Sequence, residues 1–450
     1  MLGKIKPDFQ QNLFKTRLTD FINLSHPLVL LANEMNWVAL EEKFKNLYSE
    51  LGRPSIPIRK IAGLLMLKSM FKESDESVVD RWVESPYWQY FTGEDFFQNT
   101  KPFDPSEFVH FRNRLKEVGL EYVLSQTVAL HPEAKNEKEV QVDTTVEEKN
   151  ITFPTDSKLA KKVIDKCALI AEKEGVVQRQ SYKRVAKQHL RDAYFGHHPK
   201  RKKKAKMAQK KLRTIGKRVV RELERILPEN VKNNYKSEFE NYKKVLTQER
   251  NSKDKIYSLH EPQTACIAKG KAHKAYEFGT KIAVVRGRKT GVITSMKRFA
   301  GNPHDSKTLI ETLAQSQRVR EQIGGTRPQI ASTDRGFRGV TQVEETQILI
   351  PQNKKEKSKY KQQLARDRFK ARAAIEPTIA HLKRNHALGL NFLKGVAGDI
   401  NNALLAGIGY NLKLRLNKIK EQIIFWLFLF IHKYFKNNQQ KFCVLVKGTF

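Results

Sequence analysis

Cysteine is scarce in this sequence, and this scarcity narrows the class of protein. The 450 residues include only Cys167, Cys266 and Cys443, which lie far apart. Three widely spaced cysteines can build neither a disulfide framework nor a zinc-binding knuckle. Their small number predicts a reducing, cytoplasmic compartment.

Long apolar segments are absent too. The first residues, MLGKIKPDFQQ, contain no apolar signal region. The longest apolar run extends from Ile423 to Ile431, which is too short to cross a bilayer. We therefore expect no membrane partner.

Acidic residues are far outnumbered by basic ones. The chain has 84 Lys and Arg against 48 Asp and Glu, which gives a net charge of +36. Such an excess predicts a polyanionic partner, most simply nucleic acid. Hydrophobic residues still make up 39% of the chain, so folded cores are expected, and the length suits two or three domains.

The sequence pattern changes near residue 138. Residues 1–137 carry apolar residues at helical spacing and predict an all-α N-terminal domain. From Val140, apolar and polar residues alternate, which predicts a hairpin with a polar turn at 147–150 and a second strand from Ile151. Asp143 lies inside the first strand, against strand propensity. Either it faces water at a sheet edge or it serves a function.

Residues 156–250 predict a basic helical insertion. Between Lys200 and Arg221, twelve residues are Lys or Arg and none is acidic. So many like charges repel one another unless a polyanion neutralises them, although a solvated basic face is the alternative. The candidate DNA-binding residues of this segment are Lys202, Lys203, Lys204, Lys210 and Lys211.

Short β-branched segments return between residues 256 and 298 and predict strands. His304 and Asp305 follow in a loop, where a helix cap by Asp305 is favoured over a metal site. Residues 330–333 predict a short strand that Asp334 ends. Because sites in parallel α/β sheets gather at the carboxyl ends of strands, Asp334 is well placed for chemistry.

The segment from Phe369 to Lys383 holds a third candidate carboxylate. At about 100° per residue, a helix places Arg372, Glu376 and Lys383 on one side, with Phe369 beside them. Pro377 removes one helical hydrogen bond, so we expect a kink or a fresh start near Glu376. The simpler interpretation of Arg372 and Glu376 is an exposed salt bridge.

Asp143, Asp334 and Glu376 together suit a metal-dependent reaction on a phosphodiester. Three carboxylates from neighbouring elements can hold two divalent ions about 3.5–4 Å apart, as in-line phosphoryl displacement requires. No histidine or thiolate cluster competes, so Mg²⁺ or Mn²⁺ is preferred over Zn²⁺. Spacing alone is not specific, because 48 acidic residues offer many triples.

These motifs resemble those of DDE transposases of bacterial insertion sequences, of the insertion-sequence-5 type. The resemblance rests on VDTTV around Asp143, on TDRGF around Asp334, and on the pattern R-x3-E-x6-K formed by Arg372, Glu376 and Lys383.

Two further features bear on this resemblance. In that group a tyrosine stands three residues before the arginine, where this chain has Phe369, which keeps the ring without the hydroxyl. Residues 50–130 are similar to the helical domain that precedes the catalytic domain in the group.

The resemblance implies an α/β ribonuclease H-like catalytic domain, a mixed sheet flanked by helices, over residues 138–412. The basic helical insertion at 156–250 would interrupt it. An all-α N-terminal DNA-binding domain at 1–137 would precede it, and a C-terminal tail at 413–450 would follow.

The resemblance also implies roles for the candidate residues. The three carboxylates would be catalytic and bind two Mg²⁺ (or Mn²⁺) ions. Arg372 and Lys383 would contact phosphates, and Phe369 would stack on a base. The partner would be double-stranded DNA, as element ends and as target. Because two ends must meet, a homodimer or larger assembly is expected, in the cytoplasm of a bacterium.

Two other functions stay open at this stage. A ribonuclease H-like nuclease or resolvase would use the same chemistry to cut DNA without joining it. A decayed transposase would bind DNA without catalysis, although all three carboxylates are present in this chain.

Overall fold

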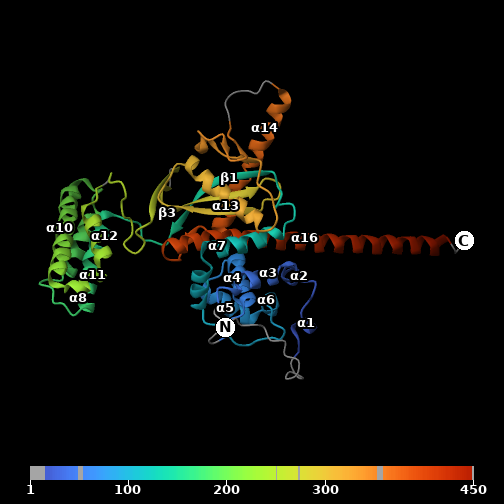
Figure 1. Cartoon of the computed structure of the whole chain (residues 1–450), viewed down its shortest axis with the longest axis horizontal. Coiled ribbons are helices and arrows are strands. Elements are labelled where there is room, and N and C mark those ends of the chain that lie inside the picture. The colour runs from blue at the N-terminus through green and yellow to red at the C-terminus, as the bar shows by residue number, and fades with distance from the viewer. Residues whose placement is uncertain (1–15, 49–53, 250, 272–273, 352–357, 448–450) are drawn as a thin grey trace.

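In the computed structural model, residues 16–48, 54–249, 251–271, 274–351 and 358–447 are described. Helices near the N-terminus lie below a mixed α/β part, and a helical bundle stands to one side of the sheet (Figure 1). The predicted mixed sheet flanked by helices and the predicted helical N-terminal region are confirmed.

The described part of the N-terminal region is built from seven helices, and most residues of one of them, α4, are buried. Its helices are α1 (Leu18–Phe21), α2 (Pro27–Glu34), α3 (Trp37–Lys45), α4 (Ile58–Phe71), α5 (Asp75–Glu84), α6 (Pro86–Phe91) and α7 (Glu107–Ala129). Ser74 begins α5 with a capping box, because its hydroxyl accepts from the Ser77 amide and its own amide donates to the Ser77 hydroxyl. The apolar side chains of α4 form the centre of this region.

One eight-stranded sheet forms the α/β part, in the order β2-β3-β1-β5-β7-β6, with β4 paired to β3 and β8 to β1. β1 runs antiparallel to β3 and parallel to β5. The strands are β1 (Glu139–Lys149), β2 (Ala265–Lys271), β3 (Lys274–Gly287), β4 (Ile293–Phe299), β5 (Ile330–Ser332), β6 (Gln342–Val343), β7 (Thr346–Leu349) and β8 (Leu390–Asn391).

The predicted hairpin at residues 140–153 is wrong. β1 continues without a turn to Lys149, and the strand antiparallel to it is β3, more than a hundred residues later. The polar stretch that indicated a turn is a buried strand end, where Glu147 and Lys149 find polar partners from distant segments. No strand begins at Ile151 in the described chain.

The two faces of the sheet pack against different layers. Val140 and Val142 of β1 and Val285 of β3 pack against α13 (Leu309–Glu321). Ile282 and Val284 of β3 belong to the core that also contains the N-terminal helices and α16 (Gly395–Lys447). The N-terminal region and this face of the sheet therefore share one hydrophobic core.

The basic insertion folds as a separate bundle. It contains α8 (Asp156–Lys173), α9 (Lys183–Tyr194), α10 (Lys202–Ile226), α11 (Glu229–Asn234) and α12 (Lys236–Thr247). Apolar side chains from α8, α10 and α12 form a core of their own, and Figure 1 shows the bundle beside the sheet. These helices occupy the segment that the sequence predicted to be helical.

α16 is the longest helix of the described chain. It packs against α7, α4 and β4, and then projects away from the rest of the protein (Figure 1). The predicted start of a C-terminal tail at residue 413 falls inside this helix. The side chains of residues 424–429, all apolar, are exposed on the projecting part. Among the described residues, no helix is both long and apolar enough to span a membrane.

Candidate active site

Asp143 lies on β1 and Asp334 follows the end of β5, and these two strands are neighbours in the middle of the sheet. β1 and β5 pair in parallel up to Gln141 and Ser332, so two residues further along each chain Asp143 stands beside Asp334. The Asp143 carboxylate accepts a hydrogen bond from the Thr144 amide at 2.7 Å. The Asp334 carboxylate accepts one from the Gly336 amide at 2.9 Å, which holds it at the start of the short turn 335–337.

A third aspartate, Asp305, lies at the same place. It accepts hydrogen bonds from the Thr144 hydroxyl at 2.9 Å and from Lys281 Nζ at 3.0 Å. A Cβ atom added to Gly336 would meet the Asp305 carboxylate at 2.8 Å and the Asp334 carboxylate at 3.0 Å. Gly336 therefore allows the two carboxylates to approach each other.

The predicted cap by Asp305 is wrong. The turn at 305–308 is capped by His304, whose ring accepts from the Ser306 amide. The side chain of Asp305 turns to β1 and β3 instead. Local sequence gave no sign of these contacts, because Thr144 and Lys281 are distant in the chain.

The electrostatics of the site disfavour a negative charge on Asp143. Burial raises the pKa of Asp143 to about 6, and the nearby charges of Asp334 and Asp305 add to this rise. The Thr144 amide and Arg372 act in the opposite direction. A cation bound here would stabilise the ionised form of Asp143, because it would compensate the clustered negative charge.

Arg372 lies between Glu376 and Asp143 and is within ion-pair distance of both. α14 (Lys359–Arg372) ends just before α15 (Ile375–Asn385), so the predicted fresh start near Glu376 is confirmed, and Pro377 lies in the first turn of α15 where it is tolerated. Arg372 lies 3.7 Å from Asp143 and 3.8 Å from Glu376, measured from guanidinium nitrogens to carboxylate oxygens. The Glu376 side chain is 68% exposed.

The remaining candidates lie on α15, α14 and α10. Lys383 Nζ lies 4.0 Å from a carboxylate oxygen of Glu277 on β3. Phe369 is half-buried on α14. The five candidate lysines of the insertion are exposed on α10, and one of them, Lys204, pairs with Asp192 at 2.9 Å.

The donor set fits a hard divalent cation in part. Asp143 and Asp334 offer adjacent carboxylate oxygens, the ligand type that Mg²⁺ and Mn²⁺ prefer. Within the described ranges, however, no three acidic, histidine or cysteine side chains are close enough to share a metal ion. Arg372 separates Glu376 from the aspartate pair in this arrangement.

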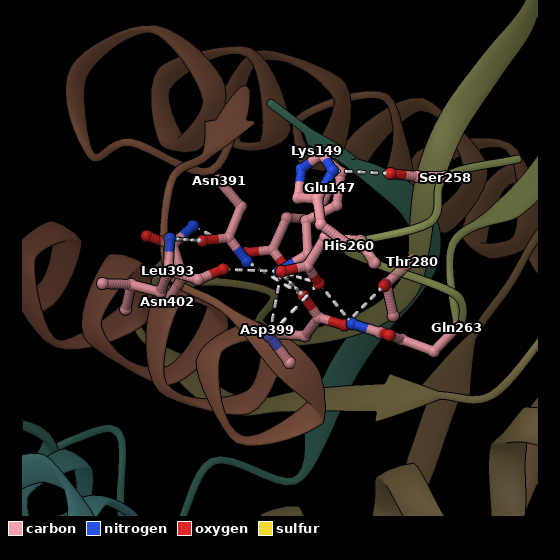
Figure 2. Close-up of polar contacts among 12 residues, drawn as sticks. Glu147, Lys149, Ser258, His260, Gln263, Thr280, Asn391, Leu393, Asp399 and Asn402 are labelled. Carbon is pink, nitrogen blue, oxygen red and sulfur yellow. Dashed lines mark hydrogen bonds and ion pairs between the residues drawn. The ribbon is translucent and has the colours of Figure 1, made fainter. Parts of the chain in front are cut away.

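A buried polar cluster holds the far end of β1 (Figure 2). Lys149 Nζ lies 2.6 Å from Asp399 and 3.3 Å from Glu261, and it donates to the Leu393 carbonyl at 2.6 Å. Asp399 also accepts from Thr280 and Asn391. Because these residues come from β1, β3, β8, α16 and the segment after the insertion, the cluster fixes the strand that carries Asp143.

Glu147 adds an acid to this cluster. One of its oxygens accepts from Asn402 at 2.6 Å, and the other is buried without a hydrogen-bond partner. Burial raises the pKa of Glu147 to about 8, and the charge of Asp399 adds to the rise. The sequence did not predict that Glu147 is a buried acid, because the alternation of apolar and polar residues does not show that a polar strand end is buried.

Two family models match the chain on either side of the insertion. Residues 16–114 match the family described as transposase domain (DUF772), and residues 252–412 match the transposase DDE domain. The second match includes Asp334 and Glu376. The chain is a DDE transposase of insertion-sequence type. Its mixed sheet is accordingly the ribonuclease H-like sheet of these enzymes.

A relative of the transposase is known from Rhizobium meliloti. It is described as an uncharacterized protein, ORF8 in the nfe locus, and is 42% identical over 185 residues, which are 40% of this chain and 88% of the relative. No solved structure matches the chain. Membership in the family implies a nucleic-acid-processing enzyme of DNA transposition, with DNA as substrate and a general dependence on divalent metal.

Proposed function

We propose that this transposase cuts DNA at the ends of its own insertion sequence and joins those ends to a target, as an enzyme of the insertion-sequence-5 type. The observation that carries the proposal is the adjacency of Asp143 on β1 and Asp334 just after β5, with Arg372 beside Asp143. The departure at Phe369 leaves the R-x3-E-x6-K pattern intact.

The carboxylates are assigned to metal binding. Asp143 and Asp334 would hold two Mg²⁺ or Mn²⁺ ions, and Glu376 would complete the set once Arg372 moves from between them. Bound ions of this kind activate the attacking oxygen and stabilise the leaving oxygen of a phosphodiester. Clustered negative charge around Asp143 supports this assignment.

The cations of the active-site helices are assigned to the DNA backbone. Arg372 Nη1 is buried without a hydrogen-bond partner, so it has a donor to offer a phosphate oxygen next to the scissile bond. Phe369 would stack on a base or support α14. Lys383 would reach a phosphate further along the strand.

The wider DNA contacts are assigned to the two helical regions. On α10, Lys202, Lys203, Lys204, Lys210 and Lys211 are all exposed. A row of exposed cations contacts phosphates without reading sequence. The N-terminal domain at 1–137 is the second DNA-binding region, and the catalytic domain extends over 138–412.

Self-association is part of the proposal, since two DNA ends must be held together. The exposed apolar side chains at 424–429 support it, because apolar patches of this kind mark interaction surfaces. The partner at this surface would be a second copy of the chain.

A cleavage and joining assay tests the proposed function. Purified protein should nick DNA that carries its own element ends only with Mg²⁺ or Mn²⁺, and then join those ends to a target. Asp334→Asn should bind these ends normally and lose cutting, whereas the matched control Asp80→Asn, at an exposed position of α5, should cut normally. Cutting without metal, or by Asp334→Asn, would contradict the proposal, and cutting without joining would favour a nuclease.

A further inference from the structure

Four arginines surround a pocket in the insertion bundle, away from the active site. The pocket has a volume of about 700 Å³ and lies between α10 and the chain before α9. Its lining includes Arg179, Tyr182, Arg218, Arg221, Glu222 and Arg225. None of these residues belongs to the lysine group that was assigned to DNA above.

The positive charge of this arginine pocket is compensated only in part. The one carboxylate in the lining, Glu222, accepts a hydrogen bond from the Arg179 amide at 2.7 Å and so holds the loop against α10. Arg221 donates to the Lys217 carbonyl. Over the part of the chain that the structure describes, none of the four arginines forms an ion pair. Four guanidinium groups with one carboxylate favour an anionic ligand.

Tyr182 fixes the geometry of the pocket. Its hydroxyl accepts a hydrogen bond from Arg218 Nη1 at 2.8 Å, and the Arg218 guanidinium lies 5.8 Å from the centre of its ring. The backbone of Tyr182 is left-handed, with φ 53° and ψ 3°. A large residue rarely adopts this conformation, and such strain is concentrated at functional sites.

α10 presents the arginines on one side only. Arg218, Arg221 and Arg225 recur at helical spacing, while Val219 and Leu223 between them face the core of the bundle. The arginines are therefore held on a helix that is anchored by its apolar side, at the end of α10 opposite to the exposed lysines.

We propose that the arginine pocket binds phosphate groups of the DNA backbone. The inference rests on the proposed function, because it takes DNA as the polyanion. Guanidinium groups bind phosphate oxygens in pairs. From Lys202 to Arg225, α10 is roughly 35 Å long, which is about one helical turn of duplex DNA. The lysines and the pocket thus form one track that a duplex can follow, which a small phosphate ligand would not need.

Salt-dependent DNA binding tests this proposal. The pair Arg218→Gln and Arg221→Gln removes two pocket cations, and the matched control, Lys232→Gln with Lys236→Gln, removes two cations of α11 and α12 outside the pocket. We expect the pocket variant to bind duplex DNA about tenfold more weakly and to flatten the plot of log affinity against log salt by about 1–2. The control should lose less than about threefold.

Further measurements distinguish binding of DNA phosphates from binding of a small phosphate ligand, and a specific loss of binding from a loss of folding. Arg225→Gln is a second pocket variant, and thermal unfolding confirms that each variant is folded. Calorimetry with inorganic triphosphate reports on small anions. Equal losses in the pocket variant and the control, an unchanged salt slope, or lost triphosphate binding with unchanged DNA binding would each overturn the proposal. Because binding is measured without divalent metal, the result does not depend on whether the chain cuts DNA.

Discussion

Arg372 Nη1 lies 3.7 Å from the carboxylate of Asp143, one of the residues that the proposed function assigns to metal binding. The same guanidinium contacts Glu376 at 3.8 Å. A single cation therefore bridges the carboxylate of Asp143 on β1 and that of Glu376 on α15. If these carboxylates bind metal as proposed, Arg372 would compete with the ion for both.

This relationship predicts that Arg372→Gln changes metal affinity and the rate of DNA cleavage in opposite directions. We expect the variant to bind Mn²⁺ about fivefold more tightly without DNA, because a guanidinium about 4 Å from a bound cation would repel it by about 1 kcal/mol per unit of its charge even under water-like screening. It should cut DNA more slowly, because a phosphate contact is lost. Electron paramagnetic resonance of Mn²⁺ and single-turnover cleavage measure the two effects.

Arg368→Gln is the matched control on the same helix. Arg368 bonds Glu139 at 2.9 Å and does not contact the aspartates. Its loss should leave Mn²⁺ affinity unchanged. Equal Mn²⁺ affinities for the two variants would show that Arg372 does not compete with metal.

Glu147 predicts a dependence of stability on pH. Its pKa is about 8 in the folded protein and 4.5 in the unfolded chain. Between these values the folded protein keeps a proton that the unfolded chain has released, so the free energy of unfolding should fall as pH rises from 5 to 8. The fall from this group is on the order of 4 kcal/mol.

Glu147→Gln tests this effect. Glutamine keeps the acceptor for Asn402 and cannot ionise, so the variant should lose much less stability than the native protein between pH 5 and pH 8 in denaturant unfolding. Glu172→Gln, at an exposed position of α8, should behave as the native protein does. Parallel curves for all three proteins would refute the role of Glu147.

Gly409 predicts a steric limit between α16 and α4. A Cβ atom at this position would lie 2.3 Å from the Ser69 carbonyl oxygen, which belongs to the main chain of α4. Gly409→Ala should therefore lower the free energy of unfolding by about 1–3 kcal/mol, as overpacking does. At Gly407 the nearest atom belongs to the Met296 side chain, at 2.8 Å, which can turn away. Thermal unfolding should show a smaller loss for Gly407→Ala.

The sequence predicted those features that depend on local pattern. Alternation placed Asp143 in a strand, a short apolar run placed Asp334 at a strand end, and Pro377 indicated the new helix start. The adjacency of Asp143 and Asp334 is not local. It depends on the register between β1 and β5, which are separated by the insertion and three strands.

The errors have a common physical cause. Glu147 and Lys149 are polar, so the sequence favoured a turn, but their partners Asn402, Glu261 and Asp399 come from distant segments and allow burial. Asp305 was expected to cap a helix because its neighbours were the only partners that local sequence offered. Burial of a charged group is decided by tertiary contacts, which a local pattern does not contain.

The separate core of the insertion bundle has an evolutionary consequence. Substitutions within that core disturb only the bundle. The outer surface of the bundle can therefore diverge in sequence, or the whole bundle can be replaced, while the sheet stays intact. The N-terminal helices lack this freedom, since their apolar residues are shared with β3 and α16. We expect related transposases to differ most in the insertion bundle and to keep the N-terminal helices and the sheet together.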